Sequence, residues 1–425
     1  MLSSDNLQIV ERDRDIPGLG TILDTDALTN ALRAGLPDAG IRALEPDYVH
    51  YKPHTNCLVA GQLKTAVGDL PFYAKAYGAD ARIKLQKTRR LQGVPSLVGP
   101  GTFVLEDTGI GFYFFPVDHR LKGLRRLADP VTEQSLLGGL LDKSHDFSDA
   151  TLRPLRYKPE RRFVACLDVS AGQKMLLKFF EPARYQAAKQ AAKVLSAPAS
   201  AGTRRANYFF DRHNVMGQEW LPGRSLSDFL LSKDASGQDK TAAIERTGTA
   251  LAELHSHPSD ELRLQRRTDE MRRLKAQAAT IGHLCPELGN RAERLALDLA
   301  TSLEDVSGEV TTLHGDFYDR QVLLSDGAPV IIDLDEAMLG HPAVDLGLFA
   351  AHLERHGLYN ALAAEEVGMF THALVRGYEH VRPAPSEQII NLYAAIGLLH
   401  LAAEPFRDCE PKWRRRMASM LAHVE

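Results

Sequence analysis

The chain has 425 residues, of which 44% are apolar and 25% are charged, and its formal net charge at pH 7 is −4. This composition is typical of a globular protein of two or three domains, and the slightly acidic balance gives no basic footprint for binding nucleic acid. The first residues lack the basic-then-apolar pattern of a secretory signal, and no apolar run approaches the roughly eighteen residues needed to cross a bilayer, so we expect no membrane contact.

The four cysteines of the chain, Cys57, Cys166, Cys285 and Cys409, lie far apart and form no CxxC pair. This spacing predicts reduced thiols in the protein core rather than a disulfide framework or a metal site. Reduced thiols in turn indicate a cytoplasmic protein.

The first half of the chain contains an internal repeat, the first feature to look for in a sequence. Tyr51-Lys52-Pro53 recurs 106 residues later as Tyr157-Lys158-Pro159, and Pro116 recurs at the same offset as Pro222. Chance similarity between amphipathic strands is the alternative explanation.

Two further pairs of segments occur in the same order as these landmarks. Residues 73–87 align with residues 176–190 when three residues are removed from the preceding turn, and helix-like segments at 24–36 and 129–141 precede the two copies. We therefore predict a duplicated unit of about a hundred residues, which is an ordinary domain size.

The second copy has the element order of a small antiparallel sheet with one helix inserted. Apolar and β-branched runs separated by turn residues predict its strands. The expected elements are strands at 152–157, 163–169 and 174–180, joined by a tight connection at 158–162 and a turn at 170–173, then a helix at 184–195, strands at 208–211 and 215–219, and a linker at 220–223.

After residue 259 the chain is mostly helical by its apolar periodicity, and one hairpin interrupts the helices. Val322-Leu323-Leu324 and Val330-Ile331-Ile332 read as its two strands, joined by a turn at 325–327. Asp316 precedes the first strand, and an acidic cluster beginning at Asp333 follows the second. Carboxylates that meet at one end of a hairpin suit a divalent cation, which prefers oxygen ligands.

The segment around this hairpin resembles the aminoglycoside phosphotransferase and choline kinase families, which are relatives of protein kinases. The matching motif is His314-Gly315-Asp316, four residues, Gln321, then Ile332-Asp333, Gly340-His341-Pro342 and Asp345. Two positions depart from the family pattern: Gln321 stands where Asn is expected, and His341 stands where Asp is usual.

The resemblance implies an α+β, bilobal protein-kinase-like fold, with an antiparallel-sheet small lobe and a mostly helical large lobe. We expect an accessory domain at residues 1–128 that resembles a duplicated small lobe, a nucleotide-binding small lobe at 129–222, and a helical large lobe with the catalytic hairpin at 223–425. No second His-Gly-Asp segment exists, so the first copy cannot complete a phosphotransfer site. It could cover the cleft, build a homodimer or sense a ligand.

In the small lobe, the resemblance makes Lys178 the lysine that pairs nucleotide phosphates. An exposed strand face is the alternative for this lysine. No Gly-x-Gly-x-x-Gly loop is present, so Arg161 or Arg162 in the 158–162 connection would contact phosphate, unless they are solvated. The following helix offers no obvious glutamate to orient Lys178. The linker residues Glu219, Trp220 and Leu221 would hold the adenine edge, with Trp220 more suited to packing.

In the large lobe, the resemblance assigns Asp316 as the base that accepts the proton of the acceptor hydroxyl, with His314 shaping the loop beside it. Asp333 would bind Mg²⁺, and Gln321 would add a carbonyl oxygen, displaced by about a bond length relative to Asn. The further metal-binding candidates are Asp335 and Glu336, and Asp345 would hold the loop by hydrogen bonds. His255 and His257 lie at the end of the first helix expected in the large lobe, and both are expected to be structural.

These residues together predict an ATP- and Mg²⁺-dependent phosphotransferase that moves the γ-phosphoryl group to a hydroxyl of a small molecule. A sugar, an aminoglycoside and an amino alcohol all remain open as acceptors, because a fold does not name a substrate. The competing interpretations are a nucleotide-binding pseudokinase without turnover and a purely structural interaction protein. A protein kinase is disfavoured, because no recognisable activation segment lies between Asp333 and Asp345.

Overall fold

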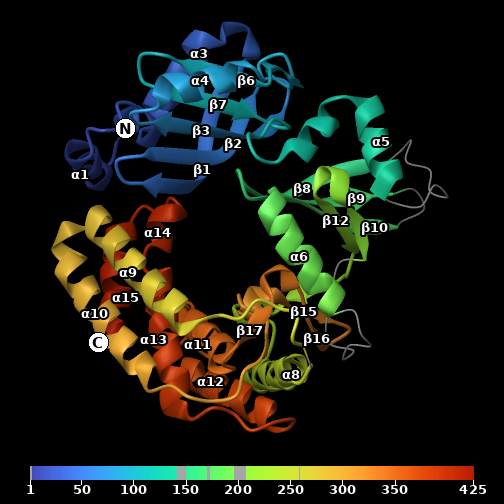
Figure 1. Ribbon diagram of the computed structural model, residues 1–425, viewed down its shortest axis with the longest axis vertical. Helices are drawn as coiled ribbons and strands as arrows, with labels where there is room; N and C mark the ends of the chain where they lie inside the picture. Colours follow the sequence, from blue (N-terminus) through green and yellow to red (C-terminus); the bar gives the residue numbers. More distant parts are fainter. Residues whose placement is uncertain (1, 141–149, 170–172, 196–206, 258) are drawn as a thin grey trace. The chain divides into compact units, whose positions relative to one another are not determined.

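We describe the protein from a computed structural model that covers residues 2–140, 150–169, 173–195, 207–257 and 259–425. The chain divides into two compact units. The first contains residues 1–185, 207–220 and 406–411, and the second contains residues 186–206, 221–405 and 412–425. Figure 1 shows the two antiparallel sheets, one in blue and one in green, that belong to the first unit.

The first sheet has five antiparallel strands in the order β1-β2-β3-β7-β6. Its central strands β3 and β7 are almost fully buried, because Phe72, Phe112 and Phe114 fill one of their faces while Tyr73 and Tyr113 fill the other. The elements of this part are α1 Ser4–Arg12, α2 Leu19–Leu23, α3 Thr25–Gly35, β1 Ile41–Lys52, β2 Asn56–Thr65, β3 Asp69–Tyr77, α4 Ala81–Arg89, β4 Pro95–Ser96, β5 Gly99–Pro100, β6 Thr102–Leu105 and β7 Ile110–Phe114.

The second sheet repeats this arrangement with the strand order β11-β12-β10-β9-β8. Its elements are α5 Pro130–Leu140, β8 Thr151–Lys158, β9 Arg162–Asp168, β10 Lys174–Phe180, α6 Pro182–Val194, β11 Tyr208–Phe210 and β12 Val215–Glu219. The strands and the helix expected from the sequence are therefore confirmed, and the expected turn at 170–173 lies largely outside the described residues. In the first sheet β3 lies between β2 and β7, and in the second sheet β10 lies in the same way between β9 and β12.

The duplication extends to buried hydrogen bonds. The carboxylate of Asp13 accepts bonds from the Tyr51 hydroxyl at 2.6 Å and the His54 amide at 2.8 Å. The carboxylate of Asp118 accepts the corresponding bonds from the Tyr157 hydroxyl at 2.7 Å and the Glu160 amide at 2.9 Å. In each copy a buried acid preceding the sheet thus fixes the turn between its first two strands, and the predicted repeat is confirmed.

The turn residues themselves are equivalent as well. His54 and Glu160 both have left-handed backbone conformations, with φ of 59° and 61°. Asp24 and Asp129, which precede α3 and α5, each accept hydrogen bonds from backbone amides two and three residues later, as N-cap residues do. Matching conformations at matching positions are not expected from chance similarity of strands.

The second unit is mostly helical. Its elements are β13 Arg224–Ser225, α7 Leu226–Leu230, α8 Gly237–His255, α9 Arg267–Leu284, α10 Pro286–Glu304, β14 Thr311–Leu313, β15 Val322–Ser325, β16 Ala328–Ile331, β17 Met338–Gly340, α11 Ala343–Leu358, α12 Ala364–Glu379, α13 Glu387–Leu401, α14 Glu404–Arg407, which continues into the first unit, and α15 Trp413–Val424. The sequence expectation of a hairpin surrounded by helices is confirmed.

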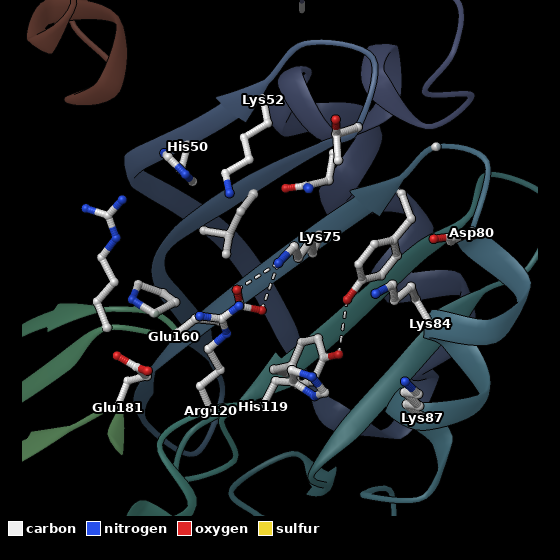
Figure 2. Close-up of a pocket in the computed structure, with 18 of the residues that line it drawn as sticks. His50, Lys52, Lys75, Asp80, Lys84, Lys87, His119, Arg120, Glu160 and Glu181 are labelled. Atoms are coloured by element: carbon white, nitrogen blue, oxygen red, sulfur yellow. Dashed lines mark hydrogen bonds and ion pairs between the residues drawn. The ribbon is translucent and has the colours of Figure 1, made fainter. Parts of the chain in front are cut away.

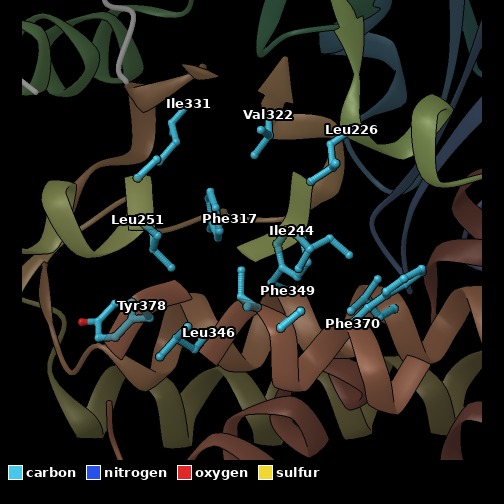
Figure 3. Packing of buried hydrophobic residues seen from close by; sticks show 14 of the residues in the cluster. Leu226, Ile244, Leu251, Phe317, Val322, Ile331, Leu346, Phe349, Phe370 and Tyr378 are labelled. Carbon is cyan, nitrogen blue, oxygen red and sulfur yellow. The ribbon is translucent and has the colours of Figure 1, made fainter. Parts of the chain in front are cut away.

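The core of the second unit connects its helices to the hairpin. Leu251 of α8, Phe349 of α11 and Tyr378 of α12 pack in one buried cluster with Phe317 and Ile331 (Figure 3). Phe317 directly follows Asp316, and Ile331 ends the return strand of the hairpin. The hydrophobic core therefore fixes the backbone on both sides of the acidic residues.

One segment corrects an expectation about apolar runs. Among the described residues, Glu387–Arg407 is long and apolar enough to cross a membrane by length and composition, with a mean hydropathy of 1.4. However, 61% of its most apolar 18-residue window is buried in the structure, and core helices of soluble proteins pass the same test. It is therefore weak evidence for a membrane span.

Candidate active site

The loop that carries Asp316 is fixed by a short two-stranded sheet. Strand β14 pairs with β17, with Leu313 opposite Met338. Gly315 has a φ of 82°, and a Cβ at this position would lie 2.5 Å from the backbone oxygen of Glu336. The glycine between His314 and Asp316 is therefore required both by backbone conformation and by the close approach of the loop that contains Glu336.

His314 is fully buried, and both of its ring nitrogens are used for loop contacts. Its Nε2 lies 2.8 Å from the backbone oxygen of Ile332, and its Nδ1 accepts a hydrogen bond from the Asp316 amide at 3.2 Å. Since Nδ1 accepts, Nε2 carries the proton and donates to Ile332. This ring links the backbone of Asp316 to the residue that precedes Asp333.

Asp345 lies beneath the same loop and is fully buried. Its carboxylate accepts hydrogen bonds from the amides of His314 at 2.7 Å and Gly315 at 2.9 Å, and it pairs with Nε2 of His255 at 3.0 Å. Burial alone would raise the pKa of Asp345, but the hydrogen bond and charge of His255 together with the nearby His314 hold this pKa below its usual range. The expectation that Asp345 holds the loop is confirmed.

Gln321 and Asp333 lie at the same end of the hairpin. The Ile332 amide donates to the backbone oxygen of Gln321 at 2.9 Å. This bond extends the hydrogen bonds between the two hairpin strands to the residue before Asp333. Asp333 has a φ of 63°, a conformation that is uncommon for a non-glycine residue and often marks functional positions. Through His314, the hairpin end and the Asp316 loop form one connected backbone framework.

The remaining acidic candidates follow directly in chain order. Asp335 is half-buried and Glu336 is exposed, and both lie in the single 3₁₀ turn Leu334–Glu336 after Asp333. Among the described residues, one set of three His, Cys, Asp or Glu side chains has its ligand atoms within 4.8 Å of one another, and it consists of Asp13, Asp15 and His54. The acids around the hairpin are thus not a closed protein cage for a metal.

A Mg²⁺ ion fits such an open donor set. Mg²⁺ is usually bound by one or two carboxylates, with water and substrate phosphates completing its coordination. Asp333 supplies a carboxylate, and Gln321, which is only 7% exposed, supplies an amide oxygen at the same end of the hairpin. These two residues would hold the ion, with Asp335 and Glu336 as further oxygen donors next along the chain.

The nucleotide-binding candidates lie in the first unit. Lys178 is in the middle of β10, between Val164 of β9 and Met216 of β12, and is only 5% exposed. The alternative of an exposed lysine on the strand face is therefore wrong. Arg161 lies in the turn before β9, and its amide donates to the Lys158 backbone oxygen at 3.1 Å.

The other small-lobe candidates occupy strand ends and the linker. Arg162 begins β9, opposite Phe180, and Glu219 ends β12, opposite Met175. The Trp220 amide donates to the Lys174 backbone oxygen at 3.0 Å, and the chain passes into the second unit at Leu221. The structure thus gathers the nucleotide candidates up to Trp220 in one unit and the catalytic and metal candidates in the other.

Glu181 does not orient Lys178 from the helix that follows β10. Its carboxylate instead accepts hydrogen bonds from the amides of Ala183 and Arg184, at 3.2 and 3.3 Å, and so caps the N-terminus of α6. This agrees with the expectation that its side chain is directed elsewhere.

Sequence reasoning missed two sets of residues. The buried acids Asp13 and Asp118 were overlooked, although they share the 105-residue offset of Asp24 and Asp129. Because Asp13 is engaged in the same hydrogen bonds as Asp118, the cluster of Asp13 with Asp15 and His54 is explained as the anchor of a turn. The second omission is the ion pair between Lys75 and Glu160, which joins the two copies and leaves no local pattern in the sequence.

Comparisons with known proteins identify the family. The model described as "Phosphotransferase enzyme family" matches residues 157–385, which is more than half of the chain. No curated protein sequence matches the chain. Among solved structures, a candidate aminoglycoside phosphotransferase from Ralstonia eutropha is 15% identical, with a TM-score of 0.50 over 69% of this chain and 96% of that chain. At this identity, the likeness shows the fold.

Two further solved structures have lower TM-scores. A macrolide 2'-phosphotransferase from Brachybacterium faecium is 17% identical, with a TM-score of 0.45 over 68% of this chain and 96% of that chain. A choline kinase from Streptococcus pneumoniae is 14% identical, with a TM-score of 0.47 over 64% of this chain and 93% of that chain.

Proposed function

The chain belongs to the phosphotransferase enzyme family, and we propose that it transfers the γ-phosphoryl group of ATP to a hydroxyl group of a small molecule. The observation that carries the proposal is the extent of the family match, which includes strand β10 with Lys178 and the segment from Asp316 through the hairpin to Asp333. The expected kinase-like fold, with an additional sheet domain before it, agrees with this function.

Phosphoryl transfer requires little covalent work from a protein, so positioning and charge neutralisation dominate. In the proposed mechanism, Asp316 accepts the proton of the acceptor hydroxyl as that oxygen attacks the γ-phosphorus. The His314 ring and the Asp345 carboxylate keep the Asp316 loop in place through its backbone amides. A rigid loop matters because small displacements of a catalytic group lower the rate strongly.

Lys178 would bind nucleotide phosphate oxygens from its strand, with Arg161 or Arg162 contributing from the neighbouring turn. Lys178 is nearly buried in the middle of β10, which is where the family resemblance places the lysine that pairs nucleotide phosphates. Asp333 and Gln321 would hold Mg²⁺, which when bound neutralises phosphate charge. The linker residues Glu219, Trp220 and Leu221 would support the adenine.

The acceptor class follows only in outline. The similar proteins named above act, by their descriptions, on a macrolide, an aminoglycoside or choline. Sugars, aminoglycosides, macrolides and amino alcohols are therefore the acceptors to test. Reduced, separated cysteines and the use of ATP both suit a cytoplasmic enzyme.

The test is an ATP-consumption screen with these four acceptor classes. We expect turnover with at least one class and a loss of at least about 100-fold in Asp316→Asn and Asp333→Asn, since each removes charge or proton acceptance that the transition state needs. Asp326→Asn is the matched control, because Asp326 lies exposed in the turn of the same hairpin. Activity that survives in Asp316→Asn would contradict the assigned base.

One observation favours a second candidate, a nucleotide-binding pseudokinase. Gln321 replaces the family's asparagine at a nearly buried position, where an added methylene shifts the carbonyl oxygen. Binding of Mg²⁺–ATP by calorimetry without turnover of any acceptor would support that alternative. Failure to bind Mg²⁺–ATP would support an interaction protein instead.

A further inference from the structure

The first unit contains a cavity whose lining does not include Lys178, although it shares Arg161 with the proposed nucleotide contacts. It has a volume of about 560 Å³, which is within the usual range for small-molecule sites. Its walls come from the β1–β2 turn, strand β3, the beginning of α4 and the residues after β7, and the turn at 159–161 of the second copy closes one side. The cavity therefore belongs mainly to the copy that has no helical lobe of its own.

The cavity is strongly basic. Seven lysine and arginine side chains line it, against three carboxylates, which leaves an excess of four positive charges. Lys84 and Lys87 lie three residues apart on the cavity-facing side of α4, and Lys52 enters from the end of β1 (Figure 2). In the part of the chain that the structure describes, the side chains of these three lysines have no hydrogen-bond or ion-pair partner.

Lys75 occupies the centre of this cavity and is the counterpart of Lys178. It lies in β3 between Leu58 of β2 and Gly111 of β7, just as Lys178 lies between the equivalent strands of the second sheet. The Lys75 ammonium lies 2.9 and 2.7 Å from the two carboxylate oxygens of Glu160 (Figure 2). A side-chain carboxylate thus occupies the position at which an anionic ligand would meet this lysine.

One partly buried histidine of the cavity, His50, lies near several of these cations. Burial, followed by the nearby cations Arg161 and Lys52, lowers the pKa of His50 to about 3. Burial also lowers the pKa of His119, where Glu160 opposes the shift more strongly than Lys75 or Arg120 supports it. Positive charges that are held close together in a partly enclosed space create a potential that attracts anions.

We propose that this cavity binds a small polyanion with two or more phosphate groups, which contacts Lys84, Lys87 and Lys52 and replaces Glu160 as the partner of Lys75. An excess of four positive charges matches the charge of a di- or triphosphate, and lysines spread over three elements suit an extended chain of phosphates. A single carboxylate would engage only part of this lining. A folded polyanion such as nucleic acid is too large for a partly enclosed cavity of this volume.

This site is for binding rather than for phosphoryl transfer. The first copy has no His-Gly-Asp loop, and the cavity's acids besides Glu160 are Asp80 and Glu181. Glu160 also belongs to the turn that contains Arg161, a candidate for phosphate contact in the second copy. A ligand that displaces Glu160 therefore acts directly on this turn, which suits ligand sensing, one of the three roles that the sequence leaves open for the first copy.

The test is titration calorimetry of the full chain with tripolyphosphate in the absence of Mg²⁺. All proteins carry Lys178→Met, which removes the phosphate-binding lysine of the second copy and isolates the first. In this background we expect measurable binding, a loss of at least about 10-fold in affinity for Lys84→Gln with Lys87→Gln, and a gain of several-fold for Glu160→Gln. The gain arises because the amide no longer competes for Lys75 as an anion.

Lys275→Gln is the matched control, because Lys275 is an exposed helical lysine that does not line the cavity. Exposed Lys84 and Lys87 have no structural partner among the described residues, and Glu160→Gln keeps the amide bonded to Asp118, so all variants should retain their thermal unfolding midpoint. Equal affinity in the Lys84/Lys87 double variant, weaker binding in Glu160→Gln, or binding abolished by Lys178→Met alone would each overturn the proposal. None of these outcomes depends on turnover, so the proposed transfer reaction stands or falls separately.

Discussion

Nε2 of His255 lies 3.0 Å from the carboxylate of Asp345, and neither side chain is exposed to solvent. The same carboxylate receives the amides of His314 and Gly315, so one buried acid connects helices α8 and α11 to the loop that carries Asp316. The residues of the family motif at this point are therefore joined in one structural assembly.

Asp345→Ala should lower the free energy of unfolding by about 3–5 kcal/mol, because it leaves a histidine and two backbone amides buried without their acceptor. It should also abolish transfer activity by releasing the Asp316 loop. Denaturant unfolding and the ATP-consumption assay measure the two effects. Asp345→Asn keeps an oxygen acceptor and should have a milder effect. An Asp345→Ala protein with unchanged stability and activity would contradict this prediction.

Stability of the second unit should fall in mild acid. Burial would raise the pKa values of Asp345, Asp319 and Glu270, but hydrogen bonds from His255, His356 and His400 outweigh it and lower them. A carboxylate with a lowered pKa stabilises the fold at pH values above its pKa in the unfolded state, which is 3.8 for Asp and 4.5 for Glu. This contribution is lost as the pH falls through the lower pKa of the folded state.

We therefore expect the free energy of unfolding to decline from about pH 4.5 downward, as measured by denaturant titrations at successive pH values. Asp319→Asn should be less stable at pH 7 and should show a shallower decline in acid. Asp298→Asn on the exposed side of α10 is the control. An unchanged pH profile in Asp319→Asn would show that this carboxylate does not contribute.

The buried acids of the two copies, Asp13 and Asp118, should contribute about equally to the free energy of unfolding. Asp118→Ala removes the acceptor of the Tyr157 hydroxyl and of the Glu160, Arg120 and Leu121 amides. Unsatisfied buried donors predict a loss of about 2–4 kcal/mol in the free energy of unfolding. Asp13→Ala should have a comparable effect through its own turn, and a neutral result for either would contradict the assignment of these acids as anchors.

A truncated chain should be designed around Asp118. A protein that begins at Val117 keeps this acid together with Leu121 and Leu124, which pack in the core of the second sheet. A protein that begins at Asp129 loses all three. We expect the shorter chain to unfold at a lower temperature, by at least several degrees, in scanning calorimetry; equal midpoints would show that residues 117–128 do not belong to the second copy's core.

The sequence was informative where structure is local. The hairpin at Val322–Ser325 and Ala328–Ile331 follows from turn residues between apolar runs, and the helices follow from apolar periodicity. The duplicated sheets were detectable from short motifs that hold equivalent positions.

What escaped prediction depends on contacts between distant segments. Nothing near Glu160 in the sequence shows that its carboxylate meets Lys75, 85 positions away. The strand pattern around Lys178 likewise could not decide between a buried and an exposed side chain, because that depends on what covers the sheet face. The role of Asp118 was hidden because it lies before the helix at which the second copy was expected to begin.

The contact between the two copies runs in one direction. Glu160 of the second copy reaches Lys75 of the first, whereas His54, which holds the corresponding turn position, pairs with Asp15 of its own copy at 2.8 Å. Such a head-to-tail contact is heterologous and does not close on itself. Along the described residues, the second sheet is followed by the helical unit rather than by a third sheet of this kind, so the head-to-tail contact at Lys75 joins two copies and does not extend into a longer array.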